Sequence, residues 1–209
     1  LSIVDMTCSG ATMEHIRNGG QVFLGPQIDA IGPDTELVTL TAGGNDVSYV
    51  GDLIMLSYRQ NGSIAGLLMN AFSNDPVPAN KRKFSDLESN TIATLKEIAR
   101  RAPHAKIVLV MYPSILPPIG SCPQLGIDEE DVALMRRVAN RFADVQRTAA
   151  QFAGVTIVDM NILSLGHDVC SSEPWVNGLA PLTGADFHPT QAGAKATARL
   201  VKQIIETTP

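Results

Sequence analysis

The feature that most constrains the fold is the alternation of strand-like and helix-like stretches along the chain. Short runs of aliphatic residues occur at residues 2–8, 36–41, 106–111 and 155–158. After each run, apolar residues recur at the spacing of a helix, at residues 12–18, 50–59, 85–98, 128–152 and 190–206. Such alternation favours a parallel sheet covered on both faces. We therefore predict an α/β fold, a flavodoxin-like three-layer α/β/α sandwich with a central parallel sheet.

Three of the predicted helices carry further detail. Ser85 and Glu88 have the spacing of a capping box at a helix start. The helix over residues 128–152 begins with acidic residues and keeps its apolar spacing as far as Phe152. The last helix is expected to bury Ala194, Ala198, Val201, Ile204 and Ile205. Between two of the predicted helices, the composition of residues 70–83 suggests a mobile flap.

Length and charge bound the kind of protein. The 209 residues favour a single domain with a sizeable core. The net charge is −5 and no basic stripe is visible, so we expect no nucleic-acid partner. The longest apolar runs are too short to cross a bilayer, so we expect no integral membrane segment. The chain starts with Leu1 rather than Met, and we expect that sequence upstream was removed or omitted.

Ligands of parallel sheets bind at the carboxyl ends of the strands, so the residues that follow each strand are the candidates for a site. Gly43-Gly44-Asn45-Asp46 follows the second strand, and Asn45 offers an uncharged amide donor suited to a developing oxyanion. Gly10, after the first strand, could present a second donor from its backbone. Taken alone, each segment is better explained as a plain turn.

His188 precedes the last helix and has the pKa range of a general base. A lone histidine at a helix start is more often structural. The four histidines have no metal-ligand spacing, so we expect no metal. Ser9 is a poor candidate for the nucleophile, because its neighbours lack the Gly-x-Ser-x-Gly pattern.

The three cysteines indicate the redox environment. Cys122 and Cys170 both lie in loops, and we interpret them as a disulfide formed in an oxidising compartment. Two free thiols in a cytosolic protein remain the alternative. Cys8 is then unpaired, which suggests a partner cysteine upstream of Leu1.

Taken together and in order, these blocks resemble the SGNH (GDSL-like) hydrolases, especially secreted esterases and lipases of actinobacteria. The resemblance rests on Cys8–Thr12, Gly43–Asp46 and the His188-Pro189-Thr190-Gln191-Ala192-Gly193 block, and it covers nearly the whole chain. It implies that Gly10 and Asn45 form the oxyanion hole and that His188 is the catalytic base. It also implies that all three meet in one cleft of a single domain spanning residues 1–209.

The chain departs from the family pattern in two ways. The Gly-Asp-Ser block with the nucleophile is absent and is expected upstream, together with a cysteine that could pair with Cys8. The family often has Asp three residues before the histidine, where this chain has Ala185. Either the Asp186 carboxylate or the Ala185 carbonyl would then orient His188, and we favour the carbonyl.

The resemblance implies a secreted or cell-envelope carboxylic ester hydrolase that acts on small-molecule or lipid esters without a cofactor. Its serine would come from the missing segment. The alternative is a non-catalytic SGNH-fold domain that binds a glycan or a lipid. A further alternative is an unrelated cytosolic α/β domain in which every motif is a turn.

Overall fold

The computed structural model describes residues 2–62, 66–67 and 76–207 of the chain. The chain divides into two compact units, which we describe separately. The first comprises Leu1–Val47, Lys83–Met111 and Phe142–Val158, and the second comprises Ser48–Arg82, Tyr112–Arg141 and Asp159–Pro209. The flap predicted at residues 70–83 lies partly outside the described residues.

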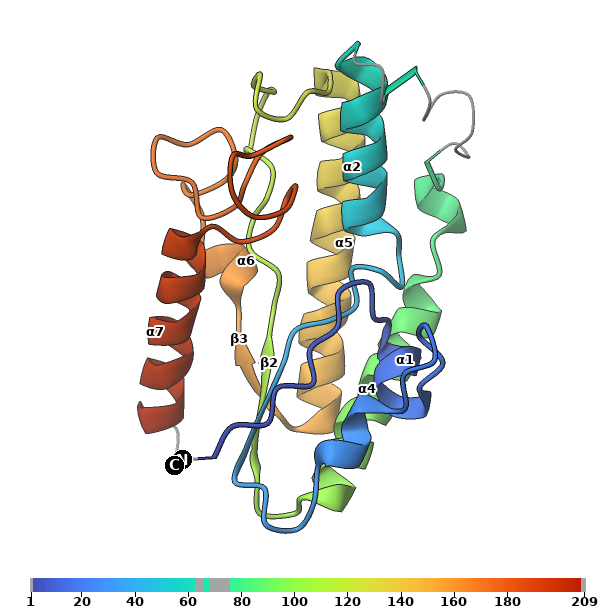
Figure 1. Ribbon diagram of the computed structural model, residues 1–209, viewed down its shortest axis with the longest axis vertical. Coiled ribbons are helices and arrows are strands. Elements are labelled where there is room, and N and C mark those ends of the chain that lie inside the picture. The colour runs from blue at the N-terminus through green and yellow to red at the C-terminus, as the bar shows by residue number, and fades with distance from the viewer. Residues whose placement is uncertain (1, 63–65, 68–75, 208–209) are drawn as a thin grey trace. The chain divides into compact units, whose positions relative to one another are not determined.

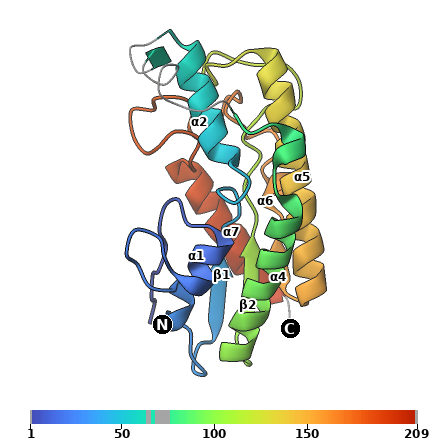
Figure 2. The same cartoon turned by 90° about the vertical axis from the view of Figure 1, so that its right-hand side faces the viewer.

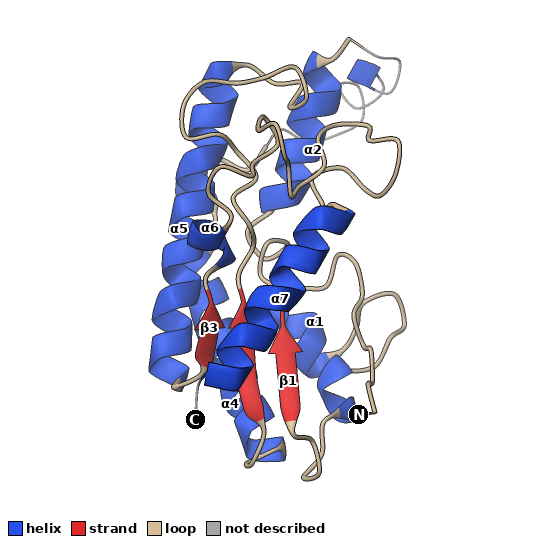
Figure 3. Cartoon of the chain, turned by 90° about the vertical axis from the view of Figure 1, so that its left-hand side faces the viewer, coloured by secondary structure: helices blue, strands red, loops and turns tan. Residues whose placement is uncertain are grey.

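The first unit is built on a parallel sheet. Its strands, in the order β1–β2–β3, are β1 (Leu37–Leu40), β2 (Lys106–Val110) and β3 (Thr156–Val158). Leu109 pairs with Leu40 on one side and with Ile157 on the other. The three arrows run in the same direction (Figure 3). Residues 107–110 of β2 are all buried, as expected for a strand covered on both faces. The α/β class and the parallel sheet are therefore as predicted.

Helices cover the sheet of this unit. They are α1 (Met13–Asn18), the 3₁₀ turn η1 (Gln27–Ala30), α4 (Phe84–Arg101) and the second part of α5 (Glu129–Ala153). α4 packs against β2, and α1 packs against α4 and η1 (Figure 2). Met13, Leu95 and Val108 are fully buried, so helices and sheet share one apolar core. This core fixes the positions of the loops that leave β1 and enter α1.

The second unit consists of helices and long loops. It contains α2 (Tyr49–Gln60), the 3₁₀ turn η2 (Ala79–Lys81), the first part of α5, α6 (Met160–Leu163) and α7 (Gln191–Thr207), labelled in part in Figure 1. The Arg82 guanidinium lies 2.6 Å from the Asp52 carboxylate, and both side chains are buried. Burial raises the pKa of Asp52 more than the adjacent Arg82 lowers it.

The predicted disulfide is present in the second unit. Cys122 and Cys170 are joined across a sequence separation of 48 residues. The bond links two loops that have no regular secondary structure around either cysteine. It therefore restrains segments that helix or sheet hydrogen bonds do not hold.

The prediction of a strand at residues 2–8 is wrong. The described part of the chain shows no strand there, and Ile3 and Val4 are 88% and 67% exposed. A strand is stable only when a neighbouring strand takes up its backbone N–H and C=O groups. None of the described strands pairs with these residues. Their aliphatic composition alone therefore did not produce a strand.

Some details of the helices also differ from the predictions. α4 begins at Phe84, and its N-cap Lys83 forms no side-chain capping hydrogen bond, so Ser85 forms no capping box. Phe152 is 66% exposed, with Lys96 Nζ 4.7 Å from its ring centre. In α7, Ala194 and Ala198 are exposed, whereas Gly193 and Ala196 are buried. Alanine tolerates either environment, so its spacing did not identify the buried face.

Among residues 2–62, 66–67 and 76–207, no helix is both long enough and apolar enough to cross a membrane.

Candidate active site

Gly10 lies in a tight turn shortly before α1. The Ala11 amide donates to the Cys8 carbonyl at 3.2 Å and closes this turn. Gly10 has a φ of +83°, a left-handed conformation that glycine adopts without steric cost. The Gln21 side chain would lie 3.3 Å from a Cβ at this position. The turn therefore favours glycine, which leaves no side chain beside the amide.

Asn45 is placed by the glycine turn that follows β1. Gly43 has a φ of +107°, and a Cβ there would lie 2.9 Å from the ring of Phe142. Asn45 itself is exposed, and its Nδ2 donates to the Ala11 carbonyl at 3.0 Å. An amide NH₂ group carries two hydrogens. One holds the residue that follows Gly10, and the other can serve a second acceptor.

Asp46 is a residue whose role the sequence did not reveal. Its two carboxylate oxygens accept from the Met13 amide at 3.2 and 3.1 Å, at the start of α1. Burial raises the pKa of Asp46, although the hydrogen bond from Met13 lowers it. A carboxylate suits the positive end of a helix. Asn45 and Asp46 thus both fasten the end of β1 to the segment that carries Gly10.

His188 is exposed on the loop before α7. Its Nδ1 lies 2.8 Å from the main-chain oxygen of Asp186. A carbonyl only accepts hydrogen bonds, so this contact assigns the ring proton to Nδ1. Nε2 then carries the lone pair of the neutral ring, which is the form that acts as a general base.

The partner of His188 differs from the one that we favoured. The Ala185 carbonyl accepts instead from the His188 amide at 3.2 Å and from Asn177 Nδ2 at 3.3 Å. The Asp186 carboxylate does not orient the ring either. It accepts from the Ala180 amide at 2.7 Å and is hydrogen-bonded to Tyr58, which raises the pKa of Tyr58. A main-chain carbonyl is the partner, but it belongs to Asp186.

The loop around His188 is held by many backbone contacts. The Asn177 amide donates to the His188 carbonyl at 2.8 Å, and Val176 forms a bridge with Pro189. Phe187 is buried despite a φ of +56°, a strained conformation for a residue with a side chain. The surrounding contacts over-determine this backbone. They hold the carbonyl of residue 186 against the imidazole.

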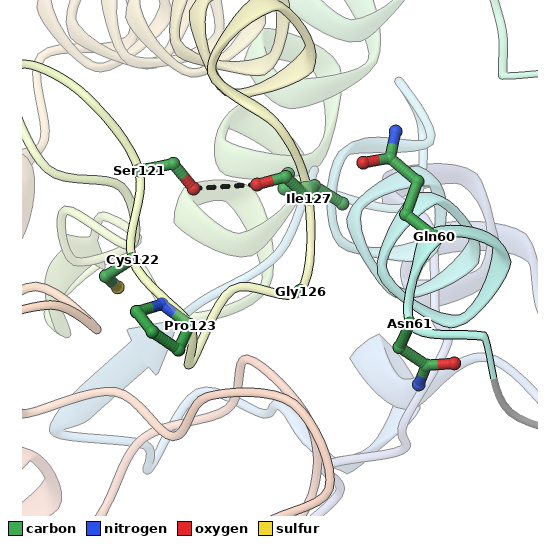
Figure 4. Close-up of a pocket in the computed structure, with 7 residues that line it drawn as sticks. All are labelled: Gln60, Asn61, Ser121, Cys122, Pro123, Gly126 and Ile127. Atoms are coloured by element: carbon green, nitrogen blue, oxygen red, sulfur yellow. Dashed lines mark hydrogen bonds between the residues drawn. The ribbon is translucent and has the colours of Figure 1, made fainter.

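The structure therefore brings Gly10 and Asn45 together in the first unit. It gathers His188, Asp186 and Ala185 in the second unit. The predicted convergence of both groups in one cleft stays a prediction. A pocket of about 610 Å³ in the second unit includes Ser121, Cys122 and Gly126 but none of the predicted catalytic or oxyanion residues (Figure 4). The described residues also contain no cluster of metal-binding side chains.

Several known proteins are similar in sequence to this chain. The GDSL-like Lipase/Acylhydrolase family profile matches residues 1–196. Lipase 2 of Streptomyces coelicolor is 32% identical over 98% of this chain and 70% of its own length. A lipase of Streptomyces rimosus is 27% identical over 89% of this chain and 63% of its own length.

Solved structures agree. The extracellular lipase of S. rimosus superposes with a TM-score of 0.71 at 26% identity, over 94% of this chain and 77% of that one. Phospholipase A1 of Streptomyces albidoflavus gives 0.73 at 23% identity with the same coverage, which supports the fold. These neighbours confirm the predicted α/β sandwich. With a family profile that spans nearly all of its residues, the chain belongs to the GDSL-like lipase/acylhydrolase family.

Proposed function

We propose that this chain is the larger part of an exported carboxylic ester hydrolase that works by serine–histidine catalysis. The observation that carries the proposal is the imidazole of His188. Its Nδ1 proton is held by a main-chain carbonyl, and its Nε2 is left basic. The family profile runs through both compact units, which supports a single hydrolase domain. The curated relatives are lipases, which supports an ester as substrate.

In this mechanism, a serine outside these 209 residues attacks the acyl carbonyl. His188 Nε2 takes the serine proton as the bond to carbon forms. The backbone amide of Gly10 and the free hydrogen of Asn45 Nδ2 stabilise the negative oxygen of the tetrahedral intermediate. His188 then gives its proton to the departing alcohol. A water molecule, activated by the same nitrogen, cleaves the acyl-serine and releases the acid.

Export is the proposed setting. The Cys122–Cys170 disulfide is typical of oxidising compartments, and the related S. rimosus lipase is extracellular. Cys8 is a free thiol among the described residues. We propose that it pairs with a cysteine outside this chain.

The test is hydrolysis of short p-nitrophenyl esters by a protein that includes the nucleophile-bearing segment. His188→Ala should lower kcat by a factor on the order of 10⁶, because serine and base act as one unit. His104→Ala is the matched control, since this exposed histidine has no role in the mechanism. Full activity in His188→Ala would exclude the mechanism. Ligand binding by a longer protein without any hydrolysis would favour the non-catalytic alternative.

A further inference from the structure

A loop in the first unit carries three adjacent apolar side chains into solvent. Val22 is 77% exposed, Phe23 103% and Leu24 51%. We call these three residues the apolar tip. Single exposed apolar residues are ordinary, but a contiguous group usually marks a binding surface.

The apolar tip belongs to a loop whose backbone conformation is defined by hydrogen bonds. The Gly20 amide donates to the Leu24 carbonyl at 3.0 Å, and the Leu24 amide donates to Gln21 at 2.8 Å. Val22 and Phe23 have φ values of +46° and +71°. Such values are rare for residues with large side chains and persist only where the surrounding structure imposes them. The fold therefore holds these side chains outward.

The same loop is fastened beside the candidate oxyanion donor. Gln21, which directly precedes the apolar tip, donates from Nε2 to the Ser9 carbonyl at 2.7 Å. Ser9 directly precedes Gly10. The base of the loop is closed as well, because a Cβ at Gly19 would lie 3.0 Å from the Gly25 backbone. Any surface that the apolar tip enters would lie next to the Gly10 turn.

The chemistry of the loop favours a neutral lipid phase. No charged residue lies between Arg17 and Asp29. Phe23 is fully exposed, so it lines no groove for a single acyl chain. A side chain that projects fully into solvent can be buried on all sides by a fluid apolar medium such as lipid. The net charge of −5 disfavours adsorption to anionic surfaces.

We propose that Val22, Phe23 and Leu24 insert into the surface of aggregated neutral lipid and dock the Gly10 turn at the lipid–water interface. The inference rests on the proposed function in taking a lipid ester as substrate. Binding itself needs no catalysis, so the two proposals can fail separately. A protein that binds lipid but hydrolyses no ester would contradict the proposed function and leave the lipid-binding proposal intact.

The test is co-sedimentation of the full-length protein with phosphatidylcholine vesicles. Phe23→Ser should lower the partition coefficient roughly tenfold, as expected for withdrawing one aromatic side chain from lipid. Replacing all three residues by serine should abolish binding, and Phe23→Trp should restore or strengthen it, because Trp favours the interface. High salt should leave binding unchanged. Thermal unfolding of each variant checks that the fold is intact.

Phe152→Ser is the matched control. Phe152 is also exposed and lies in the same unit, but it sits on α5 beneath the charged Lys96. Its replacement should leave vesicle binding unchanged. The inference is overturned if the unmodified protein does not bind neutral vesicles, if Phe23→Ser binds equally well, or if binding requires anionic lipid and disappears with salt.

Discussion

The proposed oxyanion donors and the proposed catalytic base are positioned in different ways. Gly10 and Asn45 each lie within a few residues of a regular element, and a hydrogen bond from Asn45 to Ala11 links the two segments directly. His188 instead follows a loop of more than twenty residues that begins after α6. Backbone contacts and a disulfide hold that loop.

This difference has a consequence for robustness. The donors depend on the core of the sheet, where apolar burial stabilises many residues at once. The base depends on a loop in which each hydrogen bond contributes only about 1 kcal/mol. The Cys122–Cys170 disulfide therefore contributes a large share of the restraint on this loop. We therefore expect the second unit to respond to removal of its disulfide far more than the first.

The largest expected effect on stability comes from that bond. Replacing Cys122 and Cys170 together by serine should lower the free energy of unfolding by about 4 kcal/mol, because the open loop gains entropy in the unfolded chain. Urea denaturation measures the change. The unmodified protein under reducing conditions serves as the control and should match the double variant. Equal stability with and without the bond would show that the loop contacts suffice alone.

Removing a proposed oxyanion donor should have the next largest effect, this time on the catalytic rate. Asn45→Ala should lower kcat by a factor on the order of 10² to 10³, because the donor acts mainly in the transition state. KM should change little. Asn18→Ala replaces another exposed asparagine in the same unit and should have no effect. A KM effect without a kcat effect in Asn45→Ala would assign the residue to substrate binding instead.

The two kinds of positioning also explain what the sequence could predict. β2 was predictable because four adjacent apolar residues indicate a buried strand. The glycine turn around Asn45 was predictable because it directly follows a strand. The carbonyl that contacts His188 was not predictable, because the sequence does not show which backbone oxygen lies next to a side-chain ring. The role of Asp46 was also hidden, because Met13 lies 33 positions away in the sequence.

The identity of the histidine partner is the sharpest test of this contrast. Asp186→Asn should lower kcat by no more than about tenfold, because the main-chain oxygen is unchanged and the amide oxygen can still accept from Ala180. A carboxylate that oriented the ring would give a loss of about 10⁴. Kinetics on a soluble ester distinguish the two. Asp168→Asn, in the same unit, serves to show what a purely structural aspartate costs.

The smallest effect concerns the surface charges of the first unit. Hydrogen bonds from Arg100 and Arg101 lower the pKa of Glu97 from 4.5 to about 2. A depressed pKa in the folded state favours folding above pH 4.5, and this contribution disappears as the pH falls towards 2. The Glu97 side chain is only partly buried, so solvent and salt screen most of the effect.

The stability gap between the unmodified protein and Glu97→Gln should therefore be small at neutral pH and close as the pH falls below 4.5. Urea denaturation at several pH values follows the gap. Glu88→Gln on the same helix is the control, because Glu88 forms no ion pair with the other described residues. A gap that stays constant down to pH 2 would mean that Glu97 acts through packing rather than charge. A gap as large as that of the disulfide would contradict the view that the core dominates the first unit, because surface ion pairs are usually worth little.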